Sequence, residues 1–308
     1  MITYSIGLKN KFRGITVREG MLFEGPAGWA EWSPFLDYDD ATCVSWLRAA
    51  HEAAEDGWPE PVRDRVPVNC TVPAVGPEKA AEIVRASGCG TAKVKVAEPG
   101  QTLEDDLERV EAVRDAIGAG RVRIDANGAW SVDQAVQSLK QLRRFDLEYV
   151  EQPTATVEEL AEVRRRTDVL VAADESIRRA EDPLLVKKLD AADIAVLKVQ
   201  PIGGVRACLE IAEQIGLPVV VSSALETSVG IAAGVALAAV LPELPYACGL
   251  ATVSMFTSEL VAEPLLPVDG YLPVKRLAPD PVRLEAARAD ADRTAVWEER
   301  LRRVRSAG

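Results

Sequence analysis

One pattern repeats along the chain from residue 66 to residue 251. Short apolar runs rich in β-branched residues alternate with charged segments of helical periodicity. The apolar runs predict eight strands, at 66–70, 92–96, 122–126, 149–151, 170–174, 194–199, 219–222 and 247–251. Helical patterns between them include 103–117, 132–145, 157–166, 205–215 and 229–241. Eight successive strand–helix units predict an α/β fold of the (β/α)8 TIM-type barrel class.

A doubly wound parallel sheet is the competing architecture for such a repeat. That sheet normally carries a glycine-rich turn directly after its first strand. No such turn follows the run at 66–70. The sequence therefore favours the barrel.

The two ends of the chain do not follow the repeat. Residues 2–33 alternate as strands do and are interrupted by glycines, which predicts an antiparallel meander, and 39–56 predicts a helix. The tail contains a strand-like run at 271–274 and a helical run at 282–305. We expect the ends to pack together as a discontinuous α+β capping domain, comprising 1–64 plus 256–308, beside a barrel at 65–255.

Composition limits the possible partners. The 308 residues include 48 acidic and 36 basic side chains, for a net charge of −12, whereas nucleic-acid binders carry a basic surface. The most apolar segment, 229–241, is too short to span a bilayer, and the first residues lack a targeting pattern. We expect a cytoplasmic protein that binds neither nucleic acid nor membrane.

Histidine and cysteine usage limits the possible chemistry. The single histidine, His51, lies in an Ala/Glu-rich helical stretch without catalytic or metal-ligand neighbours, so we expect it to be structural. The five cysteines include no CxxC pair and predict reduced thiols, not a zinc site or a disulfide framework. Any reaction must therefore use carboxylates, lysines or a cofactor.

Five consecutive predicted strands have a charged residue at or near their carboxyl end. These residues are Lys95, Asp125, Glu151, Asp174 and Lys198, separated by 30, 26, 23 and 24 positions, or about one strand–helix unit each. A single charge at a strand end is often only solvated, but five in a row at the end of apolar strands are costly unless paired or bound to metal. Barrel enzymes hold their active sites at this carboxyl face. The spacing therefore predicts an active site there.

Three carboxylates that converge on one point repel each other, and a divalent cation removes that conflict. A ligand set of oxygens without His or Cys favours Mg²⁺, with Mn²⁺ as the other choice. Lysines on both sides of such a cation indicate proton transfer at a carbon next to a bound carboxylate. A Schiff-base aldolase also uses a barrel lysine, but it has no need of three carboxylates on successive strands.

The same residues resemble the motifs of the enolase superfamily, in particular its muconate-lactonizing subgroup. The matching segments are Lys93-Val94-Lys95, Asp125-Ala126-Asn127, Glu151-Gln152-Pro153, Asp174-Glu175-Ser176 and Lys198. Within that subgroup, segments 12–20, 28–35 and 222–227 are most similar to the actinobacterial type of o-succinylbenzoate synthase family, with Ala30 where that family usually has glycine. The chain is also shorter than most of the superfamily, which implies a trimmed cap.

The resemblance implies a reaction and a role for each residue. Asp125, Glu151 and Asp174 would bind Mg²⁺; Lys95 would remove the α-proton and protonate the departing hydroxide, and Lys198 would stabilise the enediolate. The reaction implied is the dehydration of 2-succinyl-6-hydroxy-2,4-cyclohexadiene-1-carboxylate, a small-molecule carboxylate, to o-succinylbenzoate in menaquinone biosynthesis.

Further residues are weaker candidates for substrate binding. Each also has a structural explanation, such as an ion pair, a tight turn or a helix cap. These candidates are Lys93, Arg123, Asn127, Gly204, Ser222 and Ser223.

Two alternatives remain open at the level of sequence. A racemase of N-succinylamino acids, or another acylamino acid or dipeptide epimerase, would use both Lys95 and Lys198 as acid–base groups. The stretch 249–253 lacks the Asp-x-Asp typical of dipeptide epimerases, which counts against dipeptide substrates. A non-catalytic barrel that only binds ligands is the second alternative, although all five charged residues are present. The oligomeric state is open, and a monomer is compatible with the sequence.

Overall fold

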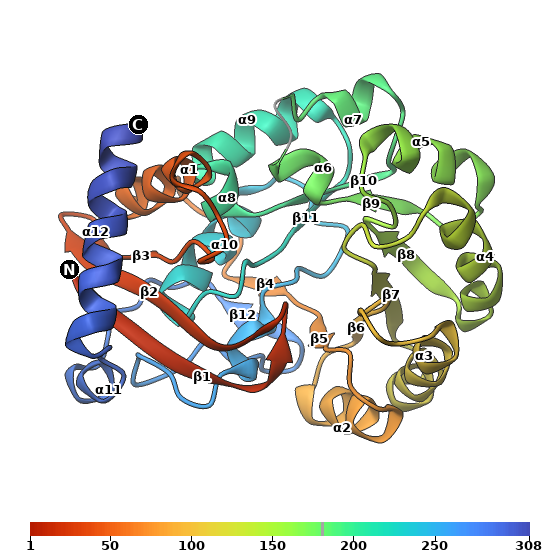
Figure 1. The fold of residues 1–308 in the computed structure, drawn as a ribbon, viewed down its shortest axis with the longest axis horizontal. Coiled ribbons are helices and arrows are strands. Elements are labelled where there is room, and N and C mark those ends of the chain that lie inside the picture. The colour runs from red at the N-terminus through yellow and green to blue at the C-terminus, as the bar shows by residue number, and fades with distance from the viewer. Residues whose placement is uncertain (180–181) are drawn as a thin grey trace.

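The computed structural model describes residues 1–179 and 182–308. Seven parallel strands lie side by side in chain order and curve around a central axis (Figure 1). They are β5 (Cys70–Val72), β6 (Thr91–Lys95), β7 (Arg121–Asp125), β8 (Leu147–Glu151), β9 (Val171–Ala173), β10 (Ile194–Leu197) and β11 (Val219–Val221). The predicted (β/α)8 class of fold is confirmed.

The eighth position of the barrel contains two bridge residues instead of a regular strand. Gly249 pairs with Ser222 at the end of β11, and Cys248 pairs with Val68 just before β5. The Cys248 N–H donates to the Pro67 carbonyl at 2.7 Å, which closes the ring of strands. The prediction of a strand at 247–251 was therefore wrong in form, because the chain turns into η3 (Ala251–Met255) after two paired residues.

The predicted first strand at 66–70 is also corrected. Its first half forms β4 (Arg65–Pro67), which pairs antiparallel with β12 (Tyr271–Pro273) of the tail. Only the following residues enter the barrel, as β5. The apolar run hides this change of partner because both halves are equally buried at their apolar positions.

Helices surround the strands on the outside of the barrel (Figure 1). The helices at Thr102, Ser131 and Thr156 start with reciprocal capping boxes, which satisfy the free N–H groups of their first turns. In chain order the helices are α2 (Pro77–Ser87), α3 (Leu103–Ile117), α4 (Val132–Leu142), η2 (Arg143–Phe145), α5 (Val157–Arg166), α6 (Glu175–Arg178), α7 (Leu185–Lys188), α8 (Val199–Ile202), α9 (Val205–Ile215) and α10 (Ser228–Val240).

Alternation along the strands separates two kinds of surface. Outward residues such as Val94, Ile124 and Val150 belong to the large core between strands and helices. Inward residues such as Tyr149 and Val196 form a separate small cluster inside the barrel. Because side chains alternate with a period of two, charged residues placed on inward positions at the strand ends point into the mouth of the barrel.

The N-terminal meander forms as predicted. It comprises β1 (Ile2–Phe12), β2 (Ile15–Gly25) and β3 (Gly28–Trp32), followed by α1 (Asp40–His51) and η1 (Glu52–Asp56). Gly20 on β2 is required by close packing, since a Cβ there would lie 2.6 Å from the Cβ of Ser33.

The tail packs on the meander, but not as one helix. It divides into α11 (Pro281–Ala286) and α12 (Ala291–Ala307), which corrects the single helix predicted at 282–305. Asp290 caps the start of α12 by accepting from the Arg293 N–H at 2.7 Å, so the break is built into the sequence. α12 lies along the meander and α1 (Figure 1). Trp297 of α12 packs edge-on against Trp32, with the two ring centres 5.5 Å apart. The division into two domains stays a prediction.

Three of the expectations from composition can be compared directly with the structure. No helix among the described residues is long and apolar enough to cross a membrane. All five cysteines are buried free thiols. His51 ends α1 and lies 5.5 Å from the ring of Phe23, within the cap.

Candidate active site

The strand register brings the first three charged residues to one level. Lys95 pairs with Asp125 across β6 and β7, and Asp125 pairs with Glu151 across β7 and β8. Neighbouring strands in a sheet are about 4.8 Å apart, so these side chains leave the barrel next to each other. Lys95, Asp125 and Glu151 therefore lie side by side in the structure, as predicted.

Asp174 and Lys198 follow the next two strands. Asp174 comes directly after β9, and Lys198 directly after β10. β6 and β10 occupy the second and sixth of eight positions around the barrel, so their ends lie across the mouth from each other. Lys95 and Lys198 therefore enter from opposite sides, with the three carboxylates on the strands between them.

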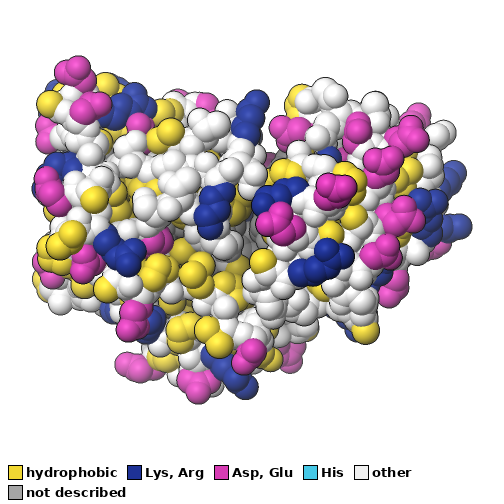
Figure 2. All heavy atoms as spheres, turned by 90° about the horizontal axis from the view of Figure 1, so that it is seen from below, with side chains coloured by type: hydrophobic (Ala, Val, Ile, Leu, Met, Phe, Trp, Pro, Cys, Tyr) yellow, Lys and Arg dark blue, Asp and Glu magenta, His cyan; other side chains and the backbone are white. Residues whose placement is uncertain are grey.

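A cavity of ≈ 720 Å³ opens at this face between the barrel and the meander. Figure 2 shows a hollow between the two parts of the molecule with Lys and Arg side chains beside it. Six of the predicted site residues line the cavity, namely Lys93, Lys95, Asn127, Lys198, Ser222 and Ser223. The three acids lie just beneath this lining and are at most 1% exposed.

Ion pairs join the lysines to the acids on the β6 side. Lys93 Nζ lies 2.9 Å from both oxygens of Glu151 and 3.4 Å from Asp125 Oδ2. Lys95 Nζ lies 2.6 Å from Asp125 Oδ2 and 2.6 Å from the amide oxygen of Asn127. The Lys95 ammonium is thus held at the cavity wall by two oxygen acceptors.

A second group of ion pairs surrounds Asp174. Lys198 Nζ donates to Asp174 Oδ2 at 2.5 Å, and Arg178 Nε donates to Asp174 Oδ1 at 2.8 Å. Arg178 also donates to Glu175 at 2.5 Å, and Glu175 accepts from Asn127 at 3.3 Å. A continuous polar network therefore runs from Lys95 through Asn127 to Lys198.

Burial and charge set the protonation of the acids in opposite directions. Burial, followed by the nearby Asp125, raises the pKa of Glu151 to about 7. Burial also acts to raise the pKa of Asp125, but Lys95 and Lys93 outweigh it, so that pKa lies below its usual range. Arg178 and Lys198 have the same net effect on the pKa of Asp174. The centre therefore combines three buried carboxylates with ion pairs to Lys93, Lys95, Lys198 and Arg178.

Sequence families match this architecture over both of its parts. Residues 77–279 match the family described as Enolase C-terminal domain-like, and residues 3–54 match Enolase N-terminal domain-like. The chain belongs to the enolase superfamily. The resemblance found in the five charged motifs is confirmed.

Two curated superfamily relatives are similar to this chain over nearly its full length. The o-succinylbenzoate synthase of Thermobifida fusca (strain YX) is 64% identical over 305 residues, covering 99% of this chain and 95% of that protein. The o-succinylbenzoate synthase of Mycobacterium tuberculosis (strain ATCC 25618 / H37Rv) is 55% identical over 300 residues, covering 97% and 91%.

A solved structure from the superfamily has the same fold. The muconate lactonizing enzyme of Pseudomonas fluorescens, complexed with muconolactone, superposes with a TM-score of 0.80 at 21% identity, covering 94% of this chain and 97% of that one. This likeness concerns the fold alone.

Enolase-superfamily sites use a Lys or His base together with one or two divalent cations. The acids here suit such an ion in type, because they are three buried carboxylates on adjacent strands. Among the described residues, however, no three acidic, His or Cys side chains lie in an arrangement that could hold a metal ion as they stand. The oxygens are instead paired with the cationic side chains of Lys93, Lys95, Lys198 and Arg178.

Two sequence candidates lie away from the cavity and need correction. Arg123 is fully buried inside the barrel, where it donates to Glu148 at 2.5 Å and to the Ala247 carbonyl at 2.6 Å. It shares a strand face with Asp125 but lies two residues deeper, so it cannot reach the mouth. Arg123 therefore forms a structural ion pair with Glu148 and does not bind substrate.

Gly204 is the second correction. Its N–H donates to the Val199 carbonyl at 3.0 Å, so it is not available to a substrate carboxylate. At a φ of +130° its Cα faces Glu52, and a Cβ there would lie 1.8 Å from Glu52 Oε2. The glycine is required by the turn and by this close approach to the cap.

The structure also adds wall residues that the sequence reasoning missed. Phe12 and Arg13 reach the cavity from the turn between β1 and β2, and Tyr38 reaches it from the loop before α1. Arg178 and Arg179 reach it from the end of α6. In the sequence, segment 12–20 is recognisable only as a family motif. Its turn position gave no indication that it would extend over the barrel.

Proposed function

We propose that this chain is an o-succinylbenzoate synthase that converts 2-succinyl-6-hydroxy-2,4-cyclohexadiene-1-carboxylate to o-succinylbenzoate with loss of water, in menaquinone biosynthesis. The full-length identity of 64% to a synthase of that name supports the reaction. The observation that carries the proposal is the pair Lys95 and Lys198, which line one cavity from opposite sides of the barrel mouth.

Lys95 is the acid–base residue in this mechanism. In its neutral form it removes the proton from the ring carbon that bears the carboxylate, and the electron pair moves into that carboxylate as an enediolate. The same ammonium then protonates the departing hydroxide as the ring becomes aromatic. Because one residue performs both transfers, proton and hydroxide leave from the same face in a syn elimination.

Lys198 acts from the opposite side of the cavity. Its ammonium is fixed at 2.5 Å from Asp174, so its positive charge is oriented before substrate arrives. A preorganised charge of this kind stabilises the negative charge that develops on the enediolate. Asn127 holds the Lys95 amine through its amide oxygen and so supports the approach to the proton.

We infer that Asp125, Glu151 and Asp174 hold a divalent cation, Mg²⁺ by preference for carboxylate oxygens, with Mn²⁺ as the other candidate. When bound, the cation supplies Lewis-acid stabilisation to the substrate carboxylate. The burial of these three carboxylates on adjacent strands, each at most 1% exposed, supports a place for positive charge at this point. We also propose a cytoplasmic enzyme with a small-molecule substrate, and a cap formed by 1–64 with 256–308.

A spectroscopic assay tests the proposed function. Purified protein is mixed with the cyclohexadiene substrate and Mg²⁺, and the loss of the diene absorbance is followed in the ultraviolet. We expect turnover that stops when a chelator is added. Absence of any absorbance change with fresh substrate and excess Mg²⁺ would rule the reaction out.

Racemisation of N-succinylamino acids is a second candidate, since the opposed lysines also suit proton exchange on both faces of an α-carbon. A Lys198→Arg variant separates the two reactions because arginine keeps the charge but does not exchange protons readily. We expect racemisation to fall by about 10² or more while part of the dehydration rate remains. Equal losses would mean that Lys198 transfers protons in both reactions.

A further inference from the structure

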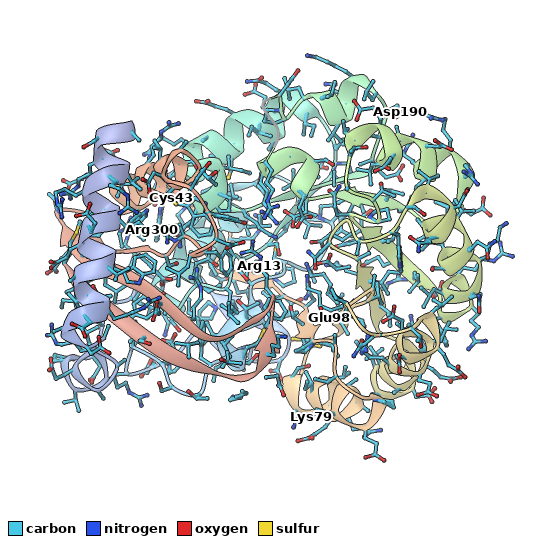
Figure 3. The ribbon with its side chains drawn as sticks, in the orientation of Figure 1. Arg13, Cys43, Lys79, Glu98, Asp190 and Arg300 are labelled. Carbon is cyan, nitrogen blue, oxygen red and sulfur yellow. The ribbon has the colours of Figure 1, made fainter. Side chains whose placement is uncertain are left out.

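Three arginines converge on one phenol oxygen in the wall of the cavity. The Tyr38 hydroxyl oxygen lies 3.1 Å from Arg13 Nη2, 3.2 Å from Arg178 Nη1 and 3.1 Å from Arg179 Nη2. All four side chains line the cavity. In Figure 3, Arg13 lies between the hairpin of β1 and β2 and the barrel. The cluster therefore joins the cap to the mouth of the barrel.

A neutral phenol is a weak partner for three cations. Its oxygen has two lone pairs, fewer than the three donors aimed at it. Burial raises the pKa of Tyr38, but the surrounding arginines outweigh it and bring that pKa below its ordinary value. Burial lowers the pKa of Arg13 and outweighs the opposite effects of Tyr38 and Asp37. The lowered pKa of Tyr38 indicates the positive charge that the three arginines place around the phenol.

Protein carboxylates neutralise only part of this charge. Arg178 is paired with the buried Asp174 at 2.8 Å. Arg13 is paired with Asp37 at 3.2 Å, but the Asp37 side chain is 67% exposed, and such a pair is weak in water. Within residues 1–179 and 182–308, Arg179 contacts the oxygen and the ring of Tyr38 and no carboxylate. Arg13 and Arg179 therefore remain able to bind an anion.

Arg178 connects this cluster to the charged residues at the barrel mouth, because it contacts both Tyr38 and Asp174. Asp174 accepts from Lys198 through one oxygen and from Arg178 through the other, and Arg178 in turn contacts Tyr38. The substrate of the proposed function carries two carboxylates, one on the carbon that loses its proton and one at the end of the flexible succinyl arm. With the first carboxylate between the lysines, the arm extends within the same cavity.

We propose that Arg13 and Arg179, positioned by Tyr38, bind the terminal carboxylate of the succinyl arm and determine specificity for a dicarboxylate. This inference rests on the proposed function. The planar fork of a guanidinium matches a carboxylate with two parallel hydrogen bonds, which the single phenol oxygen cannot offer. The carboxylate displaces the Tyr38 hydroxyl as the acceptor of both guanidiniums.

Two ligands that differ only at the end of the arm provide the test. o-Succinylbenzoate ends in a carboxylate, and 2-butanoylbenzoate keeps the ring carboxylate and the ketone but ends in a methyl group. Calorimetry with Mg²⁺ present should give wild-type protein at least about tenfold tighter binding of o-succinylbenzoate. Arg13→Met and Arg179→Met should each reduce that preference several-fold and together abolish it, with binding of 2-butanoylbenzoate unchanged.

Matched variants exclude a general effect on folding or charge. Arg302→Met removes an exposed arginine of α12, paired there with Glu299, and should leave the preference as in wild type. Arg13→Lys and Arg179→Lys keep the positive charge and should retain part of the preference for o-succinylbenzoate over 2-butanoylbenzoate. They replace the methionine variants if those do not fold. In turnover assays, the variants of Arg13 and Arg179 should have a higher KM for substrate with little change in kcat.

Two results would overturn the inference. One is equal affinity of wild-type protein for both ligands, and the other is a parallel loss of both affinities in the arginine variants. The proposed function fails separately, because it requires that wild-type protein dehydrate the cyclohexadiene substrate. A wild-type enzyme that turns over without preferring the dicarboxylate would contradict the arginine site alone.

Discussion

At the scale of single residues, chemistry depends on how exposed each side chain is to the cavity and on which groups it is paired with. Lys95 and Lys93 share one face of β6, yet they have different surroundings. Lys93 is 5% exposed; burial lowers its pKa, but Glu151 and Asp125 outweigh this and keep it above the ordinary value. Lys95 has a more open position, with a side chain 16% exposed. Lys95 is therefore the lysine suited to exchange protons with substrate.

Replacing Lys95 with alanine tests this assignment. Lys95→Ala should lower the dehydration rate by about 10² to 10⁴, because it removes the acid–base group. The fold should persist, since Lys93 still pairs with Glu151 and lies near Asp125. The measurement is the ultraviolet assay, with circular dichroism to check folding. A folded variant with near wild-type turnover would show that another group is the base.

Sequence reasoning at this scale succeeded where position along a strand was sufficient. Lys95, Asp125 and Glu151 could be aligned because parallel strands of equal phase end at the same edge. It failed for Arg123, which has the same phase as Asp125 but turns toward the other end of the barrel. A period of two predicts which face of a strand a side chain lies on. It does not predict how deep in the barrel a long side chain forms its hydrogen bonds.

At the scale of elements, the cap is attached to the barrel by buried carboxylates. Glu31 of β3 accepts hydrogen bonds from the N–H groups of Thr227 and Gly230 at the start of α10, each at 3.1 Å. Glu226, next to this contact, accepts from the Ala224 N–H at 2.7 Å. The loop from Ser222 to Leu225 lines the cavity, so this junction holds one wall of the site against the cap.

The junction gives the stability a pH dependence. Burial, and then the neighbouring Glu31, raise the pKa of Glu226 from 4.5 to about 7. Between those pH values the folded state keeps a proton that the unfolded state has lost, so the free energy of unfolding falls as pH rises through this window. Glu226→Gln has no such proton to lose. Between pH 5 and pH 8, the free energy of unfolding should therefore fall by about 3 kcal/mol more in the wild type than in this variant.

Urea unfolding at the two pH values measures this difference. Glu298→Gln, at an exposed position of α12, serves as the control and should keep the wild-type pH dependence. An identical pH dependence in Glu226→Gln and wild type would contradict the assignment of the raised pKa to Glu226.

A large aromatic residue of helix α12 packs against the meander. Trp297 is fully buried against Trp32, and its indole N–H donates to Glu19 at 3.2 Å. Trp297→Ala should lower the free energy of unfolding by about 3 to 5 kcal/mol through the cavity it leaves. Val296→Ala, at a neighbouring position 48% exposed, should change it by less than about 0.5 kcal/mol. Similar small effects in both variants would mean that α12 is not part of the cooperative fold.

At the scale of the whole molecule, the repeat of strand and helix was enough to predict the barrel, because each apolar run can be buried only between a helix and the barrel interior. The closure of the barrel was not predictable in the same way. Residues 66–70 and 247–251 have strand-like composition, but 65–67 pairs with 271–273, a partner about two hundred residues away. Local patterns carry no information about such distant pairing.

The same limit applies to the part of the cap that lines the cavity. Arg13 and Tyr38 lie in a turn and a loop, where periodicity gives no direction, and they meet Arg178 only because the whole cap is seated on the barrel. The five charged residues at the strand ends thus come from one continuous repeat, and their convergence could be predicted. The rest of the cavity wall depends on how two parts of the chain are packed together.

The central claim is that Asp125, Glu151 and Asp174 together bind one divalent cation between opposed lysines. Calorimetric titration of chelator-stripped protein with Mg²⁺, in the presence of o-succinylbenzoate, tests it most directly. We predict saturable binding of one Mg²⁺ per chain in the wild type and a loss of affinity of at least about 100-fold in Asp174→Asn, with the melting temperature confirming that the variant is folded. Wild-type protein that takes up no Mg²⁺, or a folded Asp174→Asn variant that binds it as tightly as wild type, would contradict the claim.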